Sequence, residues 1–131
     1  MRKSLLLIVL LFTSQFAHAI TRSEFDCVVK STYLEARSLD KNDWLKVANV
    51  SYNRSVHFKE YNFGAKSKHL CDIIKSKQYT SRSKLKSKIK EWDRYEEIRK
   101  TLLTNDWRHR TKALYFETKK GKMIYNVAWD K

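Results

Sequence analysis

Apolar side chains recur at helical spacing from about residue 23 onward, and this pattern predicts an amphipathic helix over residues 23–38. Ser23 is its expected N-cap. At about 100° per residue, one stripe covers roughly a third of the helix circumference, and it consists of Phe25, Val28, Val29, Thr32 and Ala36. Glu35 lies at the border of this stripe. A carboxyl group in such a position loses hydration, which suits it to donate a proton; a solvated surface glutamate is the alternative.

A second helix is predicted after a turn at residues 39–42, with Asp40 or Asn42 as its N-cap. Its apolar and small residues share one side and then extend around most of the circumference: Trp44, Leu45, Ala48, Ser51, Tyr52 and Ser55, widened by Val47 and Val50. Asn53 and Arg54 close the predicted helix. A helix that is apolar on nearly all sides is typical of a core element, so we expect the domain to pack around it.

Three further elements complete the predicted fold. Residues 70–74 indicate a short helical turn, and residues 89–105 predict a third long helix with Trp92 and Leu103 as core candidates. Aromatic-rich runs at 113–116 and 123–129 flank a turn at 119–122, a pattern typical of a β-hairpin. The sequence therefore predicts a mainly α (α+β) fold with a small C-terminal β-hairpin.

The N-terminal residues have the pattern of a secretory signal peptide. The basic residues at 2 and 3 precede an apolar run at 5–12, and Ala17 and Ala19 are the small residues that a signal peptidase reads. The run is shorter than the roughly 20 apolar residues of a transmembrane helix. We expect cleavage after Ala19 and no membrane span afterwards. Residues 20–131 then form one compact domain that is secreted, periplasmic or located in the cell wall.

The charge of the chain predicts an anionic partner. The formal charge is +14, and removal of Arg2 and Lys3 with the predicted signal peptide leaves 14 − 2 = +12 on the mature domain. Such a surface attracts polyanions, and the alternative is that the charge serves only solubility. Seven basic residues and no acidic residue occur between Lys75 and Lys90. This basic segment is either a contact for anionic wall polymers or a solvated loop.

Both cysteines, Cys27 and Cys71, lie in the predicted mature domain. An even number of cysteines in an exported protein favours one disulfide, with two buried free thiols as the alternative. Neither cysteine has a second ligand at the short spacing of a zinc site, and the histidines also lack the spacing of metal ligands. We expect no metal and no cofactor.

Five short motifs occur together in the chain after Cys27. They are STYLEAR at 31–37, VANVSYNR at 47–54, LCDII at 70–74, QYT at 78–80 and ALYF at 113–116. In their order and spacing they resemble the spore-cortex-lytic cell wall hydrolases of the SleB/CwlJ type, over residues 27–116. That family carries Glu-Ala-Arg, Val-Ala-x-Val-x-x-Asn-Arg, Cys-x-Val-Ile, Gln-Phe-Ser and Ala-Leu-Tyr-Phe. This chain departs from the family where Ser38 and Leu39 replace Gly-Glu, and where Tyr79 and Thr80 replace Phe-Ser.

The resemblance implies a lysozyme-like fold, peptidoglycan as the substrate, and Glu35 of the Glu-Ala-Arg motif as the catalytic acid. Cleavage between N-acetylmuramic acid and N-acetylglucosamine requires a proton on the glycosidic oxygen. Hydrolases normally use a second carboxylate, but four nearby candidates are more easily interpreted as helix caps or surface charges: Asp40, Asp43, Glu60 and Asp72. One acid suffices for a lytic transglycosylase, in which groups of the substrate replace the base. We expect this activity from a monomer.

Four residues are candidates for substrate binding. Asn53 can hold a sugar acetamido group or orient Glu35, or it can be a structural cap. Gln78, Tyr79 and Thr80 offer an amide, an aromatic face and a hydroxyl, a set suited to a sugar, or they form a loop held by backbone contacts. The competing function is a catalytically silent secreted module that binds wall polyanions or nucleic acid. Because no nucleic-acid-binding motif is present, we do not expect nucleic acid as a partner.

Overall fold

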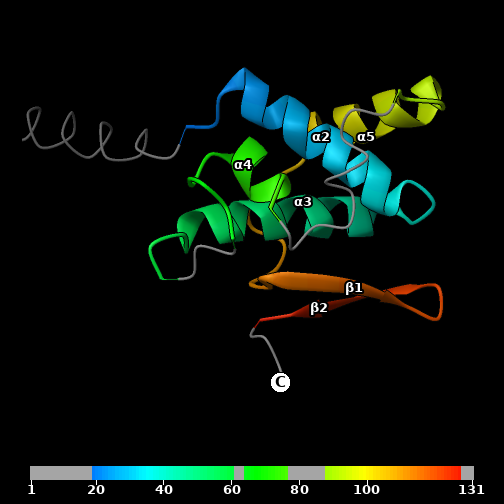
Figure 1. Ribbon diagram of the computed structural model, residues 1–131. Helices are drawn as coiled ribbons and strands as arrows, with labels where there is room; N and C mark the ends of the chain where they lie inside the picture. The colour runs from blue at the N-terminus through cyan, green and yellow to red at the C-terminus, as the bar shows by residue number, and fades with distance from the viewer. Residues whose placement is uncertain (1–18, 61–63, 77–87, 128–131) are drawn as a thin grey trace, which may run out of the picture.

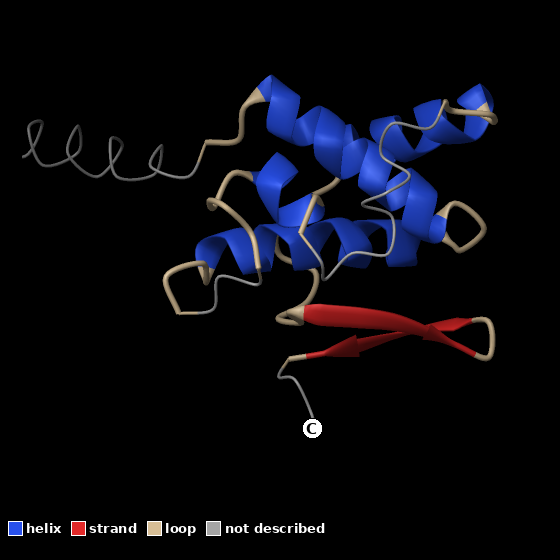
Figure 2. Ribbon diagram, viewed as in Figure 1, coloured by secondary structure: helices blue, strands red, loops and turns tan. Residues whose placement is uncertain are grey.

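A computed structural model describes residues 19–60, 64–76 and 88–127 (Figure 1). Within these residues the elements are helices α2 (Arg22–Ala36), α3 (Lys41–Val56), α4 (Leu70–Ile74) and α5 (Trp92–Thr104), and strands β1 (Tyr115–Lys119) and β2 (Lys122–Asn126). Helices α2 and α4 pack against α3 on one side, and the hairpin lies on its other side (Figures 1 and 2). The predicted mainly helical fold with a small C-terminal hairpin is confirmed.

Helix α3 forms the centre of the core, as its sequence predicts. Asp40 is its N-cap, and the Asp40 carboxylate accepts a hydrogen bond from the backbone N–H of Asp43 at 2.9 Å. Its buried residues face several directions: Trp44, Leu45, Val47, Ala48, Asn49, Val50, Ser51 and Arg54. Helix α3 is contacted by α2, α4, α5 and β1, so apolar side chains around most of its circumference are buried against other elements.

The N-cap of helix α2 lies two residues earlier than predicted, at Thr21 and not at Ser23. The Thr21 hydroxyl accepts a hydrogen bond from the backbone N–H of Glu24, and the Glu24 carboxylate accepts one from the backbone N–H of Thr21. This reciprocal capping box satisfies two backbone donors at once, which a serine at position 23 alone does not achieve. Val28, Val29, Thr32 and Ala36 of the predicted stripe are buried.

Helix α5 turns a different face to the core from the one predicted. Trp92 and Leu103 are 60% and 57% exposed, whereas Ile98 and Leu102 are buried. Ile98 and Leu102 are four residues apart and share one face, while Trp92 and Leu103 point about 120° to 140° away from Ile98. The two predicted core positions were therefore wrong, because size and apolarity alone do not reveal which face of a helix packs against α2 and α3.

The hairpin closes as predicted, through a two-residue turn at Lys120 and Gly121. Both residues have positive φ, 53° and 75°, as the mirror-image turns of β-hairpins require. The Tyr125 hydroxyl donates a hydrogen bond to the Asp43 carboxylate at 2.6 Å, which ties β2 to the first turn of α3. Burial raises the pKa of Tyr125, and the Asp43 carboxylate raises it further.

The predicted signal peptide falls almost entirely on residues 1–18, which lie outside the described residues. Among the residues that are described, no helix is long and apolar enough to cross a membrane.

Candidate functional site around Glu35

Glu35 lies in the last turn of α2, one residue before the helix ends at Ala36. Its side chain is half-buried, while Thr32 and Ala36 beside it on the helix are buried. This is the position at the border of an apolar stripe that the sequence predicts. A carboxyl group there is close to the surface and at the same time partly shielded from water.

Contacts from α3 and from the start of α5 hold the end of α2 in place. The Trp44 indole N–H donates a hydrogen bond to the carbonyl oxygen of Ala36 at 2.8 Å. The Arg37 guanidinium forms an ion pair with the Glu91 carboxylate at 3.1 Å. The Tyr33 hydroxyl accepts a hydrogen bond from the backbone N–H of Glu91 at 3.1 Å. The backbone that carries Glu35 is therefore fixed on both sides of this residue.

The other half of α2 is joined to α4 by two connections. A disulfide links Cys27 to Cys71, as the cysteine count predicts, with 5.4 Å between the Cα atoms. The Glu24 carboxylate also accepts a hydrogen bond from the backbone N–H of Leu70, at the start of α4, at 2.9 Å. Burial acts to raise the pKa of Glu24, but the hydrogen bonds from Leu70 and Thr21 outweigh it, so the pKa lies below its ordinary value.

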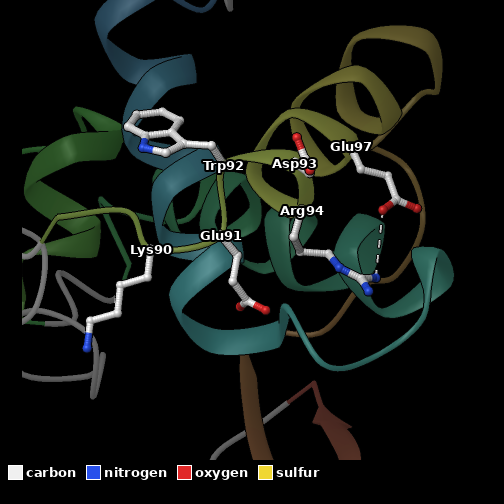
Figure 3. A pocket seen from close by; sticks show the side chains of 6 residues that line it. All are labelled: Lys90, Glu91, Trp92, Asp93, Arg94 and Glu97. Carbon is white, nitrogen blue, oxygen red and sulfur yellow. Dashed lines mark ion pairs between the residues drawn. The ribbon is translucent and has the colours of Figure 1, made fainter.

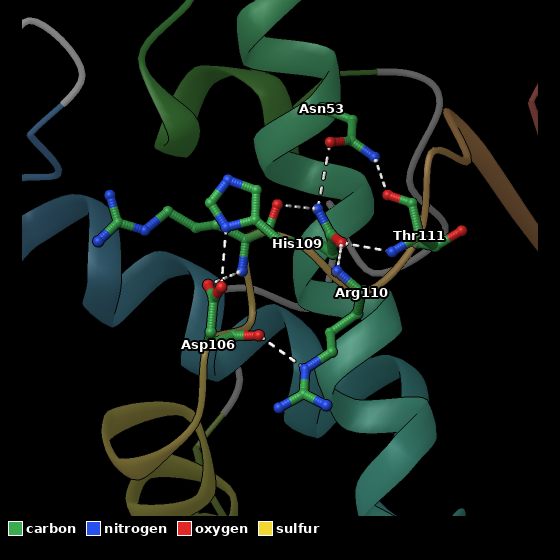
Figure 4. A network of polar contacts seen from close by, with 7 residues as sticks. Asn53, Asp106, His109, Arg110 and Thr111 are labelled. Carbon is green, nitrogen blue, oxygen red and sulfur yellow. Dashed lines mark hydrogen bonds and ion pairs between the residues drawn. The ribbon is translucent and has the colours of Figure 1, made fainter. Parts of the chain in front are cut away.

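Asn53 is the candidate substrate ligand whose contacts the structure describes. Its side-chain amide donates a hydrogen bond to the carbonyl oxygen of Thr111 (Figure 4) and one to that of Ala113, both at 2.9 Å. Its side-chain oxygen accepts a hydrogen bond from the amide of Asn49 at 3.1 Å. These contacts correspond to the structural alternative for Asn53, because they fasten the segment before β1 onto α3.

Asn49 is a structural residue that the sequence analysis did not identify. It is buried, and its oxygen accepts hydrogen bonds from the backbone N–H groups of Arg110 and Thr111 (Figure 4). Its amide donates to the carbonyl oxygen of Arg108 at 2.9 Å and to Asn53. All four hydrogen bonds that an asparagine side chain can make are thus used. The available signal was an asparagine on the buried surface of a helix that is otherwise mostly apolar.

Arg54 was also expected only to close the second helix, and it is instead a buried link to the hairpin. Its Nε donates a hydrogen bond to the carbonyl oxygen of Leu114 at 2.6 Å, and its guanidinium lies 5.1 Å from the centre of the Tyr115 ring. The Asn-Arg pair of the second motif therefore connects α3 to the chain that leads into β1.

The four carboxylates that were considered as partners for Glu35 all have contacts elsewhere. The pairs are Asp40 with the backbone N–H of Asp43, Asp43 with Tyr125, Glu60 with His57, and Asp72 with Ser67. They act as caps and surface charges, as expected from the sequence. Gln78, Tyr79 and Thr80 lie outside the described residues. The same is true of the rest of residues 77–87 in the basic segment.

Glu35 lines neither of two cavities on the described surface. One, of about 510 Å³, lies at the start of α5, and the other, of about 800 Å³, lies between the start of α2 and residues 102–108. Within the described part of the chain, no group of three or more histidine, cysteine, aspartate or glutamate residues is placed to hold a metal ion.

Comparison with known proteins adds no relative: no family model, curated protein or solved structure matches this chain.

Proposed function

We propose that the chain is a secreted enzyme that cleaves the glycan strand of peptidoglycan, with Glu35 as its general acid. The observation that carries the proposal is the half-buried glutamate of the Glu-Ala-Arg motif at the braced end of α2. A general acid must keep a fixed position beside its substrate, and the contacts of Ala36 and Arg37 provide this. The Cys27–Cys71 disulfide supports an oxidising compartment such as the periplasm or the cell wall.

The engagement of the other carboxylates supports a lytic transglycosylase over a hydrolase that uses two carboxylates. In the proposed step, Glu35 gives its proton to the glycosidic oxygen of N-acetylglucosamine while the bond to C1 of N-acetylmuramic acid breaks. The 6-hydroxyl of N-acetylmuramic acid then attacks C1, and its proton returns to Glu35. The product is a 1,6-anhydro sugar, and no water is consumed.

Mass spectrometry of the products tests this proposal directly. Residues 20–131 are incubated with purified peptidoglycan sacculi, and the released muropeptides are expected to carry anhydro ends that lack one water relative to hydrolysed ends. Reducing ends in place of anhydro ends would contradict the transglycosylase step and indicate a hydrolase. Intact sacculi after prolonged incubation would contradict the enzymatic function itself.

One described surface favours a second candidate function, the binding of an anionic wall polymer. The basic loop, residues 108–112, exposes Arg108, His109, Arg110 and Lys112. Its backbone is held to α3 by Asn49 and Asn53 (Figure 4). Because the loop is already ordered, binding a polyanion there costs little additional conformational entropy.

Neutralising the basic loop is expected to weaken wall binding in a salt-dependent way. Replacing Arg108, Arg110 and Lys112 by glutamine should lower the affinity for an anionic wall polymer by about tenfold at low salt and much less at 0.5 M, because salt screens exposed charges. The matched control replaces the three lysines of the hairpin turn by glutamine, which removes the same charge elsewhere: Lys119, Lys120 and Lys122. Equal losses in a sedimentation assay for both variants would show that only net charge matters.

A further inference from the structure

The smaller of the two cavities lies at the start of α5, next to the end of α2. Its volume is about 510 Å³, which is within the range of roughly 300–1,000 Å³ typical of ligand sites. It is lined by Lys90, Glu91, Trp92, Asp93, Arg94 and Glu97. In Figure 3 the side chains of Lys90 and Trp92 extend to one side of Glu91, and those of Arg94 and Glu97 extend to the other. The cavity is therefore an open trough, not an enclosed pocket.

Trp92 is the largest apolar side chain in this trough, and it is 60% exposed. Its ring meets Tyr95 edge to face, with 5.3 Å between the ring centres, and Tyr95 meets buried Tyr33 of α2 in the same manner at 5.9 Å. These contacts hold the indole against the protein while most of its surface remains in water. An ordered, exposed aromatic face suits a flat ligand with apolar C–H groups.

The charged residues of the trough include both signs. Two are basic and three are acidic, so the local formal charge is close to neutral on a domain that is strongly basic overall. Three of them are already paired: Arg94 with Glu97 at 3.7 Å, and Glu91 with Arg37. A polyanion would meet three carboxylates here, which disfavours it. A neutral ligand with several hydroxyl or amide groups meets both donors and acceptors.

Glu91 also joins the trough to the end of α2. Its carboxylate bonds Arg37, which is two residues beyond Glu35, and its backbone N–H bonds Tyr33, which is two residues before it. The trough is thus joined to the last turn of α2, on the side of the helix that faces away from Glu35.

We propose that this trough is a sugar-binding subsite for uncharged β-1,4-linked N-acetylhexosamine units, with the ring of Trp92 as its stacking platform. The polar side chains around it bind the hydroxyl and acetamido groups. The inference rests on the proposed function for its biological ligand, the glycan strand, but the binding itself does not require cleavage.

The test measures binding of the β-1,4-linked tetramer of N-acetylglucosamine to residues 20–131 that carry Glu35→Gln and Trp129→Phe. The first change prevents cleavage by Glu35, and the second removes a tryptophan that lies outside the described residues. Trp44 and Trp107 are buried, but Trp107 lines the larger cavity, so the emission change is assigned to Trp92 by its loss in a further Trp92→Phe variant. We expect a blue shift and reduced acrylamide quenching on addition of the tetramer.

Calorimetry then compares the affinities of variants of this protein. Trp92→Ala should weaken tetramer binding by about tenfold, as expected for a tryptophan that anchors an interface, and Trp92→Phe should weaken it less. The control is Leu103→Ala, an exposed apolar residue on the same helix, which should change the affinity less than twofold. Absence of tetramer binding, or equal affinity of the Trp92→Ala variant, would overturn the subsite. Full activity of the Glu35→Gln variant on sacculi would refute the catalytic proposal, but it would not change the conclusion from tetramer binding at Trp92.

Discussion

Glu35→Gln is expected to fold as the wild type does and to lose most of its activity on peptidoglycan. The substitution keeps the size and the hydrogen-bonding capacity of the side chain but removes the proton that a general acid donates. General acid catalysis contributes about 10²- to 10⁴-fold, so the rate of sacculus solubilisation should fall by that factor. The measurement is the initial rate of muropeptide release, with circular dichroism spectra and unfolding midpoints recorded for both proteins.

The matched control is Glu117→Gln, which makes the same chemical change at an exposed position of β1. It should retain the wild-type rate. Binding to sacculi should survive in both variants, because neither substitution touches the basic loop or the Trp92 trough. A folded Glu35→Gln protein that solubilises sacculi at the wild-type rate would remove Glu35 from the mechanism.

Loss of the Cys27–Cys71 disulfide should produce the largest change in stability. The two cysteines are 44 residues apart, and restricting an unfolded loop of this length stabilises the folded state by about 4 kcal/mol in the chain-entropy account. Typical domains are stable by only about 5–15 kcal/mol, so this is a large fraction of the total. Urea unfolding of Cys27→Ala/Cys71→Ala should therefore show a much lower midpoint than the oxidised wild type.

Two controls separate the cross-link from side-chain packing. Wild-type protein treated with reductant should unfold close to the midpoint of the double alanine variant, since it keeps both sulfur atoms but loses the bond. Product analysis at low temperature, where the variant is folded, should still show cleavage, because Glu35 is held by Trp44 and Glu91 and not by the disulfide. A free energy of unfolding within 1 kcal/mol of the wild-type value would contradict the stabilising role.

The sequence was sufficient for those parts of the fold in which local pattern and tertiary packing agree. Helix α3 is apolar on most sides because it is surrounded, and Gly121 suits the positive φ that the hairpin turn requires at its position. The boundary of α2 was missed because two capping signals compete within three residues. The N-cap is Thr21 and not Ser23, because the side chains of Thr21 and Glu24 each accept a hydrogen bond from the backbone N–H of the other residue.

The predictions that failed, or were incomplete, depend on contacts between residues far apart in the chain. Trp92 and Leu103 look like core residues until the face of α5 that packs against α2 is known. The roles of Asn49 and Asn53 follow from hydrogen bonds to residues about 60 positions later. No local periodicity contains that information. The position of Glu35, by contrast, follows from spacing within a single helix.

The covalent link between α2 and α4 also determines how the chain responds to a single proteolytic cut. Every residue of α3 lies between Cys27 and Cys71, so a single peptide-bond cut anywhere in that interval leaves both pieces joined through sulfur. Helix α5 and the hairpin follow Cys71 and have no such protection. One cut between Cys71 and Trp92 would divide the polypeptide in two, separating the helix that carries Glu35 from the trough at the start of α5.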